Sequence, residues 1–493
     1  MNKQIRQLGI ALVVCYVALF GMLNQIQLFG AEALNERPEN TDVIRIDYAR
    51  NRGSISTADG TVIAESVPVN DEFDFQRRYP TGDLFAAATG FYSFEFGATG
   101  LERSYQDELV GDTAEQQLRG FADLFVGEDQ VGDLRTSLRT DLQQQAKDML
   151  GQRRGAVVAI DPRTGEILAL WDYPSYDPNL LAGHDFAVVR EQRAFLQPDD
   201  PNSPLVATSY QDRYFPGSTF KVVVGSSGLK FGVVSPESPS YPVESSWVPP
   251  QTTRPMNNSH TCGGTLFVIL AESCNTSFAR MAVETLHADR TIAGAEAFGF
   301  NREPPIDLPG AVASNFPTDF TDNAPALAQS AIGQFEVAAS PLQMALIAAT
   351  IANDGVTMAP HVVTQLRDGD GDVVETYDPE VWLQPISAGD AATMQEAMRG
   401  VLGGTATNLA GLPGLDVGAK TGTAQLGTDP PSSHAWMIAW AGPEGSEPEI
   451  AVAVLVEGTP GVGSEATGNS EAGPIARCII ATALEVDGGS GCP

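Results

Sequence analysis

A serine and a lysine stand three residues apart in the segment RYFPGSTFKVVV, residues 213–224. Pro216 and Gly217 predict a turn, and Ser218 then opens a helix. Free N–H groups and the positive end of the helix dipole at that place favour an oxyanion. Lys221 lies one turn along, beside the Ser218 hydroxyl. A desolvated lysine can take a serine proton as a neutral amine, so the pair predicts a serine nucleophile with a lysine base.

The same spacing occurs a second time in the chain, at Ser227 and Lys230. This copy lies late in the same predicted helix, contains Gly228 and lacks a preceding turn. Its serine therefore cannot occupy a helix N-terminus, and we interpret the copy as a polar helix end. The spacing alone is weak evidence for catalysis.

A second short motif, ESCNTSF at 272–278, interrupts a helical region. Ser273 and Asn275 are short polar residues that point the same way from a tight loop. Ser273 can relay a proton, and Asn275 can hold a substrate amide or the lysine. Alone, this tripeptide pattern is common and mostly structural.

A third motif, VGAKTGTAQ at 417–425, has the pattern of a strand. Lys420, Thr421 and Thr423 would project from an edge that can bind a substrate carboxylate. Gly422 would remove the side chain that otherwise blocks the approach of a peptide backbone. The chain has only five lysines, so finding Lys221 and Lys420 in two such settings carries weight.

The elements that must position these motifs are both helical and extended. Alternating residues around Asp59-Gly60 predict a hairpin at 45–65, and a second, apolar hairpin is predicted at 155–171. Helices are predicted at 140–150, 218–230, 264–286, 341–354 and 473–484, and late strands at 416–425, 435–442 and 449–458. Strands at both ends of a domain with helices between them predict an α+β fold. We place a domain boundary near residue 150.

The composition of the chain limits which functions and which cellular compartment are plausible. The chain of 493 residues is long enough for two or three domains, and its net charge of −33 argues against nucleic-acid binding. Five cysteines without C-x-x-C spacing and only five histidines argue against a zinc site, and no cofactor is expected. Apart from Cys15, the cysteines are even in number, which permits two disulfides in an oxidising compartment.

The first thirty residues predict an uncleaved membrane anchor rather than a cleaved signal peptide. Lys3 and Arg6 precede an apolar run from Leu8 to Leu23, extended to Phe29, which is near the lower limit for a span. The basic flank predicts a cytoplasmic N-terminus, a single pass, and an extracellular location for residues after about 30.

In the order S-x-x-K, S-x-N and K-T-G, the three motifs are the mark of penicillin-binding proteins and class A β-lactamases. The whole chain resembles the class B penicillin-binding proteins, the monofunctional D,D-transpeptidases, in their shorter actinobacterial form. The resemblance extends to RGSISTADG (52–60), TGLERSYQDELVG (99–111), DPRTGEILAL (161–170), PSYDPNLL (174–181), SAIGQFEVAASPLQMALIAATIANDG (330–355) and SHAWMIAWAG (433–442).

The resemblance implies three parts of the chain. Residues 1–30 would be the cytoplasmic tip and transmembrane anchor, and 31–150 a short β-rich pedestal of the dimerisation type. Residues 151–493 would form a transpeptidase domain with an all-α part and a five-stranded antiparallel sheet with helices. The active site would lie between those two parts.

The resemblance also implies a mechanism. Ser218 would be acylated by the penultimate D-Ala of a peptidoglycan stem pentapeptide, with release of the terminal D-Ala, and an amine of a neighbouring stem would then attack. Lys221 would be the base, Ser273 and Lys420 would shuttle the proton, and the N–H groups of Ser218 and Thr423 would form the oxyanion hole. β-Lactams would be trapped as acyl-enzymes, because no deacylating glutamate is evident.

The implied partners and the alternatives follow from the same resemblance. No glycosyltransferase-like domain precedes residue 150, so a separate glycosyltransferase partner in the membrane is implied. A D,D-carboxypeptidase or a β-lactamase would use the same trio, but secreted β-lactamases lack the anchored pedestal. An antibiotic sensor is disfavoured by a cytoplasmic segment of about seven residues, and an inactive scaffold by the intact motifs.

Shorter family members suggest a Cys262–Cys274 disulfide, and Cys478 with Cys492 is a second candidate pair.

Overall fold

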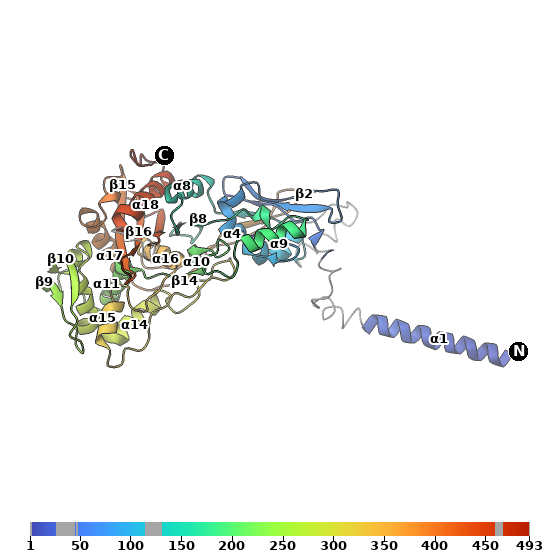
Figure 1. Ribbon diagram of the computed structural model, residues 1–493, viewed down its shortest axis with the longest axis horizontal. Coiled ribbons are helices and arrows are strands. Elements are labelled where there is room, and N and C mark those ends of the chain that lie inside the picture. The colour runs from blue at the N-terminus through green and yellow to red at the C-terminus, as the bar shows by residue number, and fades with distance from the viewer. Residues whose placement is uncertain (1, 26–44, 46–47, 114–130, 459–466, 493) are drawn as a thin grey trace.

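The structure is a computed structural model that describes residues 2–25, 45, 48–113, 131–458 and 467–492 (Figure 1). Helix α1 (Asn2–Gln25) covers most of the stretch in which the anchor is expected. Residues 26–30 of that expected anchor lie outside the described residues. No helix within the described ranges combines the length and the apolar character that crossing a membrane requires.

A five-stranded antiparallel sheet, ordered β15-β16-β17-β7-β8, forms the centre of the C-terminal domain. The strands are β7 (Gly155–Ile160), β8 (Ile167–Tyr173), β15 (Leu415–Gln425), β16 (Ser433–Pro443) and β17 (Ile450–Val456). The predicted hairpin at 155–171 and the three predicted late strands therefore join in one sheet. Strand β15 forms one of its two edges, which leaves alternate backbone groups of that strand without a sheet partner.

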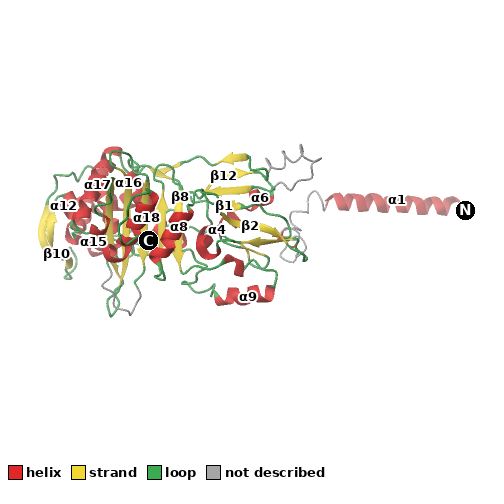
Figure 2. Cartoon of the chain, turned by 90° about the horizontal axis from the view of Figure 1, so that it is seen from above, coloured by secondary structure: helices red, strands yellow, loops and turns green. Residues whose placement is uncertain are grey.

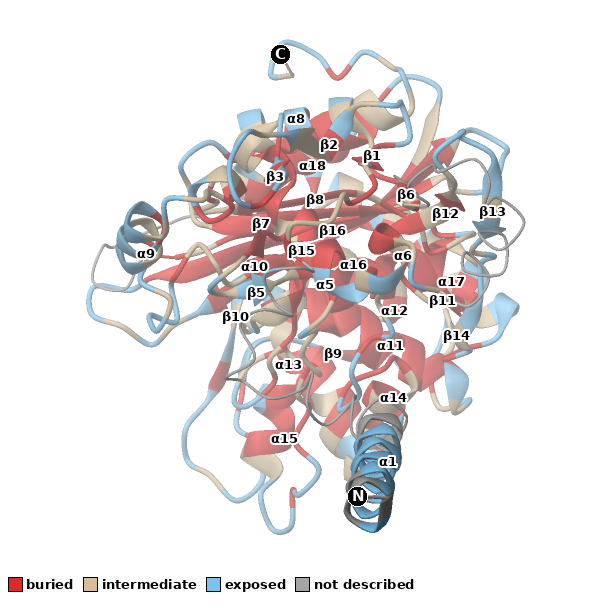
Figure 3. Cartoon of the chain, turned by 90° about the vertical axis from the view of Figure 1, so that its right-hand side faces the viewer, coloured by how far each residue is buried: buried red, intermediate tan, exposed pale blue. Residues whose placement is uncertain are grey.

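Helices cover both faces of this sheet (Figure 3). Every residue of β7 and β17 is buried. Helix α16 (Pro341–Ala352) packs against β7, β16 and β17 and is buried along its whole length, as its apolar sequence predicts. Helices α8 (Thr140–Leu150) and α18 (Gly473–Ala483) pack together on the other face.

The all-α part follows η4 (Gly217–Phe220), a short 3-10 turn. Its helical segments are α11 (Lys221–Lys230), α12 (Leu266–Ala271), α13 (Asn275–Arg280), η5 (Met281–Leu286), α14 (His287–Ala297), α15 (Ala324–Ser330) and α17 (Ala388–Gly400). The helical run predicted at 264–286 is broken between α12 and α13. A hairpin of β9 (Tyr241–Trp247) and β10 (Met256–Gly264), which was not predicted, packs beside this break.

The pedestal is built on a six-stranded sheet, ordered β13-β12-β6-β1-β2-β3 (Figure 2). Its strands are β1 (Ile55–Ser56), β2 (Val62–Pro68), β3 (Phe75–Arg78), β6 (Asp133–Thr136), β12 (Val363–Arg367) and β13 (Val373–Thr376). Shorter elements make up the rest of the secondary structure in the described residues: η2 (Gly82–Phe85), α4 (Ala86–Thr89), β4 (Tyr92–Ser93), β5 (Gly97–Ala98), α5 (Gly100–Ser104), α6 (Gln106–Val110), η3 (Pro178–Leu180), α10 (Thr208–Gln211), β11 (Thr357–Met358), β14 (Val381–Leu383), η6 (Val401–Gly403), η7 (Thr407–Leu409) and η8 (Gly468–Ala472).

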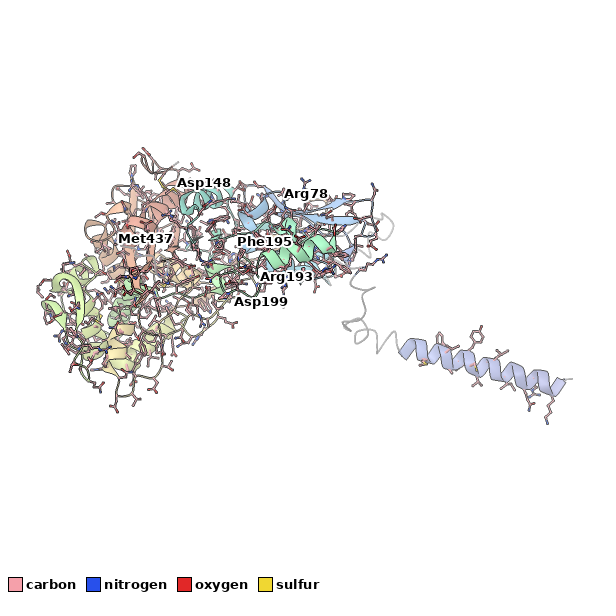
Figure 4. The ribbon with its side chains drawn as sticks, in the orientation of Figure 1. Arg78, Asp148, Arg193, Phe195, Asp199 and Met437 are labelled. Carbon is pink, nitrogen blue, oxygen red and sulfur yellow. A yellow bond between two sulfur atoms is a disulfide. The ribbon has the colours of Figure 1, made fainter. Side chains whose placement is uncertain are left out.

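Packing does not divide the chain at a single point near residue 150. Strands β12 and β13 return from the C-terminal half to complete the pedestal sheet, whereas α8 packs on the C-terminal domain. Helix α9 (Phe186–Phe195), which carries the labelled Arg193 and Phe195, lies beside the pedestal (Figure 4). Its first residue, Phe186, stacks on Phe94 with ring centroids 4.9 Å apart. The two parts thus exchange segments, which fixes their contact more firmly than one linker would.

Candidate active site

Ser218 is the second residue of η4, the turn that directly precedes α11. The Trp436 indole N–H donates to the carbonyl of Phe215 at 2.9 Å, and the Gly217 N–H donates to the carbonyl of Gly333 at 3.0 Å. These bonds hold the turn in place. Ser218 is partly exposed and lines a cleft of about 800 Å³. The first N–H groups of a helix lack intrahelical partners, so this position suits a nucleophile whose reaction forms an oxyanion.

Lys221 is fully buried behind the cleft. Its amino group donates to the Ser273 carbonyl at 2.6 Å, to Ser273 Oγ at 3.1 Å and to Asn275 Oδ1 at 2.7 Å. Burial first, and the charge of Lys420 second, lower the pKa of Lys221 well below its ordinary value. A lysine with so low a pKa loses its proton readily and can act as a base. The Ser218 hydroxyl makes no hydrogen bond with any described residue.

Lys420 approaches Ser273 from strand β15. Its amino group donates to Ser273 Oγ at 3.0 Å and to the Thr421 carbonyl at 3.0 Å. Burial lowers the pKa of Lys420 to about 7. The Ser273 hydroxyl therefore lies between two buried amines, and the three groups form a continuous path for a proton.

The loop that carries Ser273 is held on both sides. Ser273 has φ +57°, an uncommon conformation for a residue with a side chain. The structure pairs the next residue, Cys274, with Cys262 of β10 in a disulfide, with Cα atoms 5.9 Å apart. Asn275 Nδ2 also donates to the carbonyl of Asn257 at 2.9 Å. The second candidate pair, Cys478 and Cys492, is bridged as well.

Strand β15 forms a wall of the cleft. Thr421, Thr423 and Gln425 line it, at the spacing of two that places side chains on one face of a strand. The two threonines predicted to bind a carboxylate therefore face the cleft, close to Ser218 and Ser273.

Gly422 does not line the cleft, which corrects the role expected from its sequence. A Cβ at this position would lie 2.7 Å from the carbonyl oxygen of Pro216 and 2.9 Å from Cβ of Trp436. The missing side chain lets the Ser218 turn pack against β15. It makes room for the backbone of Pro216, in the turn that precedes Ser218, and not for a substrate.

The second serine–lysine pair lies away from the cleft. Ser227 is 1% exposed, and its hydroxyl donates to the carbonyl of Val223 within α11 at 2.7 Å. Lys230 ends that helix and donates to the carbonyl of Pro385. A serine in the middle of a helix satisfies its hydroxyl on its own backbone, which makes it a poor nucleophile.

Two family models match the chain. The penicillin-binding protein transpeptidase domain matches residues 155–481, and the penicillin-binding protein A dimerisation domain matches residues 52–134. The chain belongs to the class B penicillin-binding proteins. The three sequence motifs of this penicillin-binding protein lie wholly inside the matched transpeptidase region.

Individual relatives agree with the family match. The chain is 39% identical to the peptidoglycan D,D-transpeptidase PbpA of Mycolicibacterium smegmatis, over 98% of this chain and 99% of the relative. It is 30% identical to the peptidoglycan D,D-transpeptidase MrdA of Escherichia coli, over 77% and 62%. The ceftriaxone acyl-enzyme complex of penicillin-binding protein A from M. tuberculosis superimposes with a TM-score of 0.81 at 36% identity, covering 89% of this chain and all of that one.

The cleft of this penicillin-binding protein also has walls that the motifs did not identify. They include Asn257, Gln329, Gln334, Thr405, Thr467 and Asn469. Gly333, which directly precedes the lining residue Gln334, is a signal in the sequence that could have indicated this wall. Gly333 has φ +71°, and a Cβ there would lie 2.2 Å from the carbonyl oxygen of Gly217.

Proposed function

We propose that this peptidoglycan D,D-transpeptidase forms its acyl-enzyme on Ser218. The observation that supports this most strongly is the meeting of Lys221 and Lys420 on Ser273 Oγ, directly behind the cleft that Ser218 lines. The donor is a peptidoglycan stem peptide, and β-lactams inhibit the enzyme by acylating the same serine. Both inferences rest on the named activity of the relatives and on the acyl-enzyme complexes of their structures.

Acylation begins when Lys221, as a neutral amine, takes the hydroxyl proton of Ser218. Ser218 Oγ attacks the carbonyl carbon of the penultimate D-Ala, and the N–H groups of Ser218 and Thr423 receive the negative charge on oxygen. The bond to the terminal D-Ala then breaks. The leaving amine takes a proton from the Ser273 hydroxyl, and Lys420 replaces that proton. The proton held by Lys221 then passes through Ser273 Oγ to Lys420, so Lys221 is a neutral amine again before the acceptor arrives.

The end of the donor that carries the free carboxylate binds at β15. Thr421 and Thr423 offer hydroxyl donors on the cleft wall, and Lys420 supplies positive charge from behind. Asn275 orients the substrate amide and, through its side-chain oxygen, the amine of Lys221. Penicillins present a carboxylate at the corresponding place and are bound by the same groups.

The catalytic domain works outside the cytoplasm. The two disulfides support an oxidising compartment, and the basic residues before the apolar run of the N-terminus support attachment to the membrane with the remainder outside. A separate glycosyltransferase in the membrane supplies the glycan strands, because neither family model matched to this chain is a glycosyltransferase.

Intact-mass analysis after incubation with penicillin tests the nucleophile. The protein and its Ser227→Ala variant should each gain the mass of one antibiotic molecule, and Ser218→Ala should gain none. A thermal unfolding curve for each variant shows that it is folded. An adduct on Ser218→Ala would remove Ser218 from the role of nucleophile. An enzyme that hydrolyses a stem-peptide donor, and transfers none of it to an acceptor that is present, would be a carboxypeptidase.

A further inference from the structure

One charged side chain lines the cleft among the described residues, and it is Glu272. Lys221 and Lys420 are fully buried behind the wall and do not line it. The remaining lining residues are uncharged polar, apolar or glycine. The proposed chemistry of Ser218, Lys221, Ser273 and Lys420 makes no use of this carboxylate.

The carboxylate of Glu272 is held at the cleft and is not on a free loop. Glu272 directly follows α12 and precedes Ser273, and the Cys262–Cys274 disulfide joins this loop to β10. Glu272 and His260 each stand two residues before a bridged cysteine, and Glu272 Oε2 lies 2.7 Å from His260 Nε2. Both side chains remain nearly half exposed, at 46% and 47%, so a ligand in the cleft can reach the carboxylate.

The second substrate of a transpeptidase is a primary amine, which carries a proton in water at neutral pH. A carboxylate in an otherwise uncharged cleft, next to the proton-relay serine, is suited to hold such a cation. The donor's charge is the opposite, since its carboxylate binds at the threonines of β15. The two substrates would thus be sorted by charge onto two different elements of the cleft.

We propose that Glu272 binds the ammonium group of the acceptor stem peptide and sets the enzyme's preference for a cationic acceptor. The proposal rests on the transpeptidase function above. The ammonium group, held by Glu272, gives one proton to solvent and one to the amine of Lys221 as its nitrogen bonds to the ester carbonyl carbon. The bond from that carbon to Ser218 Oγ breaks, and Lys221 returns its proton to Oγ. Glu272 only positions the cation.

The test measures how the acyl-enzyme partitions between transfer to an added amine and hydrolysis by water. The donor is an acylated D-Ala-D-Ala peptide, and the acceptor is a stem peptide with a free side-chain amine. Glu272→Gln should raise the KM for this acceptor roughly 5- to 20-fold, the range of a hydrogen-bonded ion pair at a half-exposed site. Glu272→Asp should retain part of the preference, and Glu272→Lys should lose more than Glu272→Gln.

Two controls separate cation binding from a structural role. Hydroxylamine is uncharged at neutral pH, so its reaction with the acyl-enzyme should not share the rise in KM. Glu336 is exposed and does not line the cleft, so Glu336→Gln removes an equal charge elsewhere and should behave as the parent protein.

Each outcome decides a separate point. An equal loss with hydroxylamine and with the cationic acceptor would show that Glu272 shapes the loop, and it would overturn the proposal. An acceptor KM that is the same in Glu272→Gln and Glu336→Gln would overturn it too. A parent protein that penicillin does not acylate would instead contradict the proposed function, since that reaction needs no acceptor.

Discussion

The amino groups of Lys221 and Lys420 meet on a single acceptor, the hydroxyl of Ser273, at 3.1 and 3.0 Å. Both lysines are fully buried, and no carboxylate among the described residues bonds to either amino group. Two cations in this arrangement repel each other and lack water, so the neutral form of one is favoured. The pair can therefore supply one base and one positive charge at the same time.

The pH dependence of acylation should report this coupling. In Lys420→Gln, Lys221 stays buried but loses the neighbouring charge that lowers its pKa, so that pKa should rise. The ascending limb of the penicillin acylation rate should therefore move to higher pH. Rates measured from about pH 5 to about pH 10 check this. Lys230→Gln, at the far end of α11, is the control, and an unshifted limb in Lys420→Gln would contradict the coupling.

Lys420→Met should stabilise the fold at neutral pH although it impairs catalysis. Burial lowers the pKa of Lys420 from 10.5 to about 7, so the unfolded chain binds more protons between these values. The free-energy penalty of burying the protonated Lys420 in the folded state is complete below about pH 7, and it disappears as the pH rises toward 10.5. The gain in unfolding free energy, on the order of 1–3 kcal/mol, should shrink over that range in urea titrations. A gain that does not vary with pH would indicate packing instead of charge.

Gly422→Ala should displace the nucleophile without touching the substrate. The added methyl group would collide with the carbonyl oxygen of Pro216, so the Ser218 turn must move. We expect a loss of about 1–3 kcal/mol in stability together with slower penicillin acylation. Gly400→Ala in α17, where nothing lies within 4 Å of the new atom, is the matched control. Full acylation activity in Gly422→Ala would refute the packing role.

Thr423→Val removes a hydroxyl group from the cleft wall at nearly constant volume. Acylation by penicillin should slow by about tenfold, because one donor to the ligand carboxylate is lost. Thr261→Val, on an exposed position of β10 that does not line the cleft, should acylate as the parent does. An unchanged rate in Thr423→Val would exclude its side chain from the site, although its N–H could still serve.

The two disulfides offer a matched comparison. They join residues 12 and 14 positions apart, so each should contribute roughly 3 kcal/mol to stability in the chain-entropy model. Replacing Cys262 and Cys274 by alanine should also slow acylation, because the loop that carries Ser273 loses its tie to β10. Replacing Cys478 and Cys492 should cost stability alone. Urea unfolding and acylation rates measured on both variants check this, and equal acylation losses would contradict it.

Local features of the chain were predictable because they depend on near neighbours. Helix α8 begins and ends where its sequence indicates, and the Ser218 turn, the β15 strand and the broken helix at Ser273 lie on the elements expected for them. The preference for Ser218 over Ser227 as nucleophile, which stays a prediction, also rests only on a turn and a helix start. The exposed strand β13, which has no buried residue, carried too weak an alternation to be recognised.

The amino-acid sequence by itself determined on what kind of element each candidate catalytic residue lies, and it predicts which of them carry the chemistry. The tertiary structure alone decided that Ser273 Oγ receives both lysines, that Gly422 makes room for Pro216, and that Glu272 faces the cleft beside His260. It also decided that β12 and β13 complete the pedestal sheet. Each of these contacts joins segments distant in the chain. Their meeting depends on how whole surfaces pack, and no local periodicity encodes it.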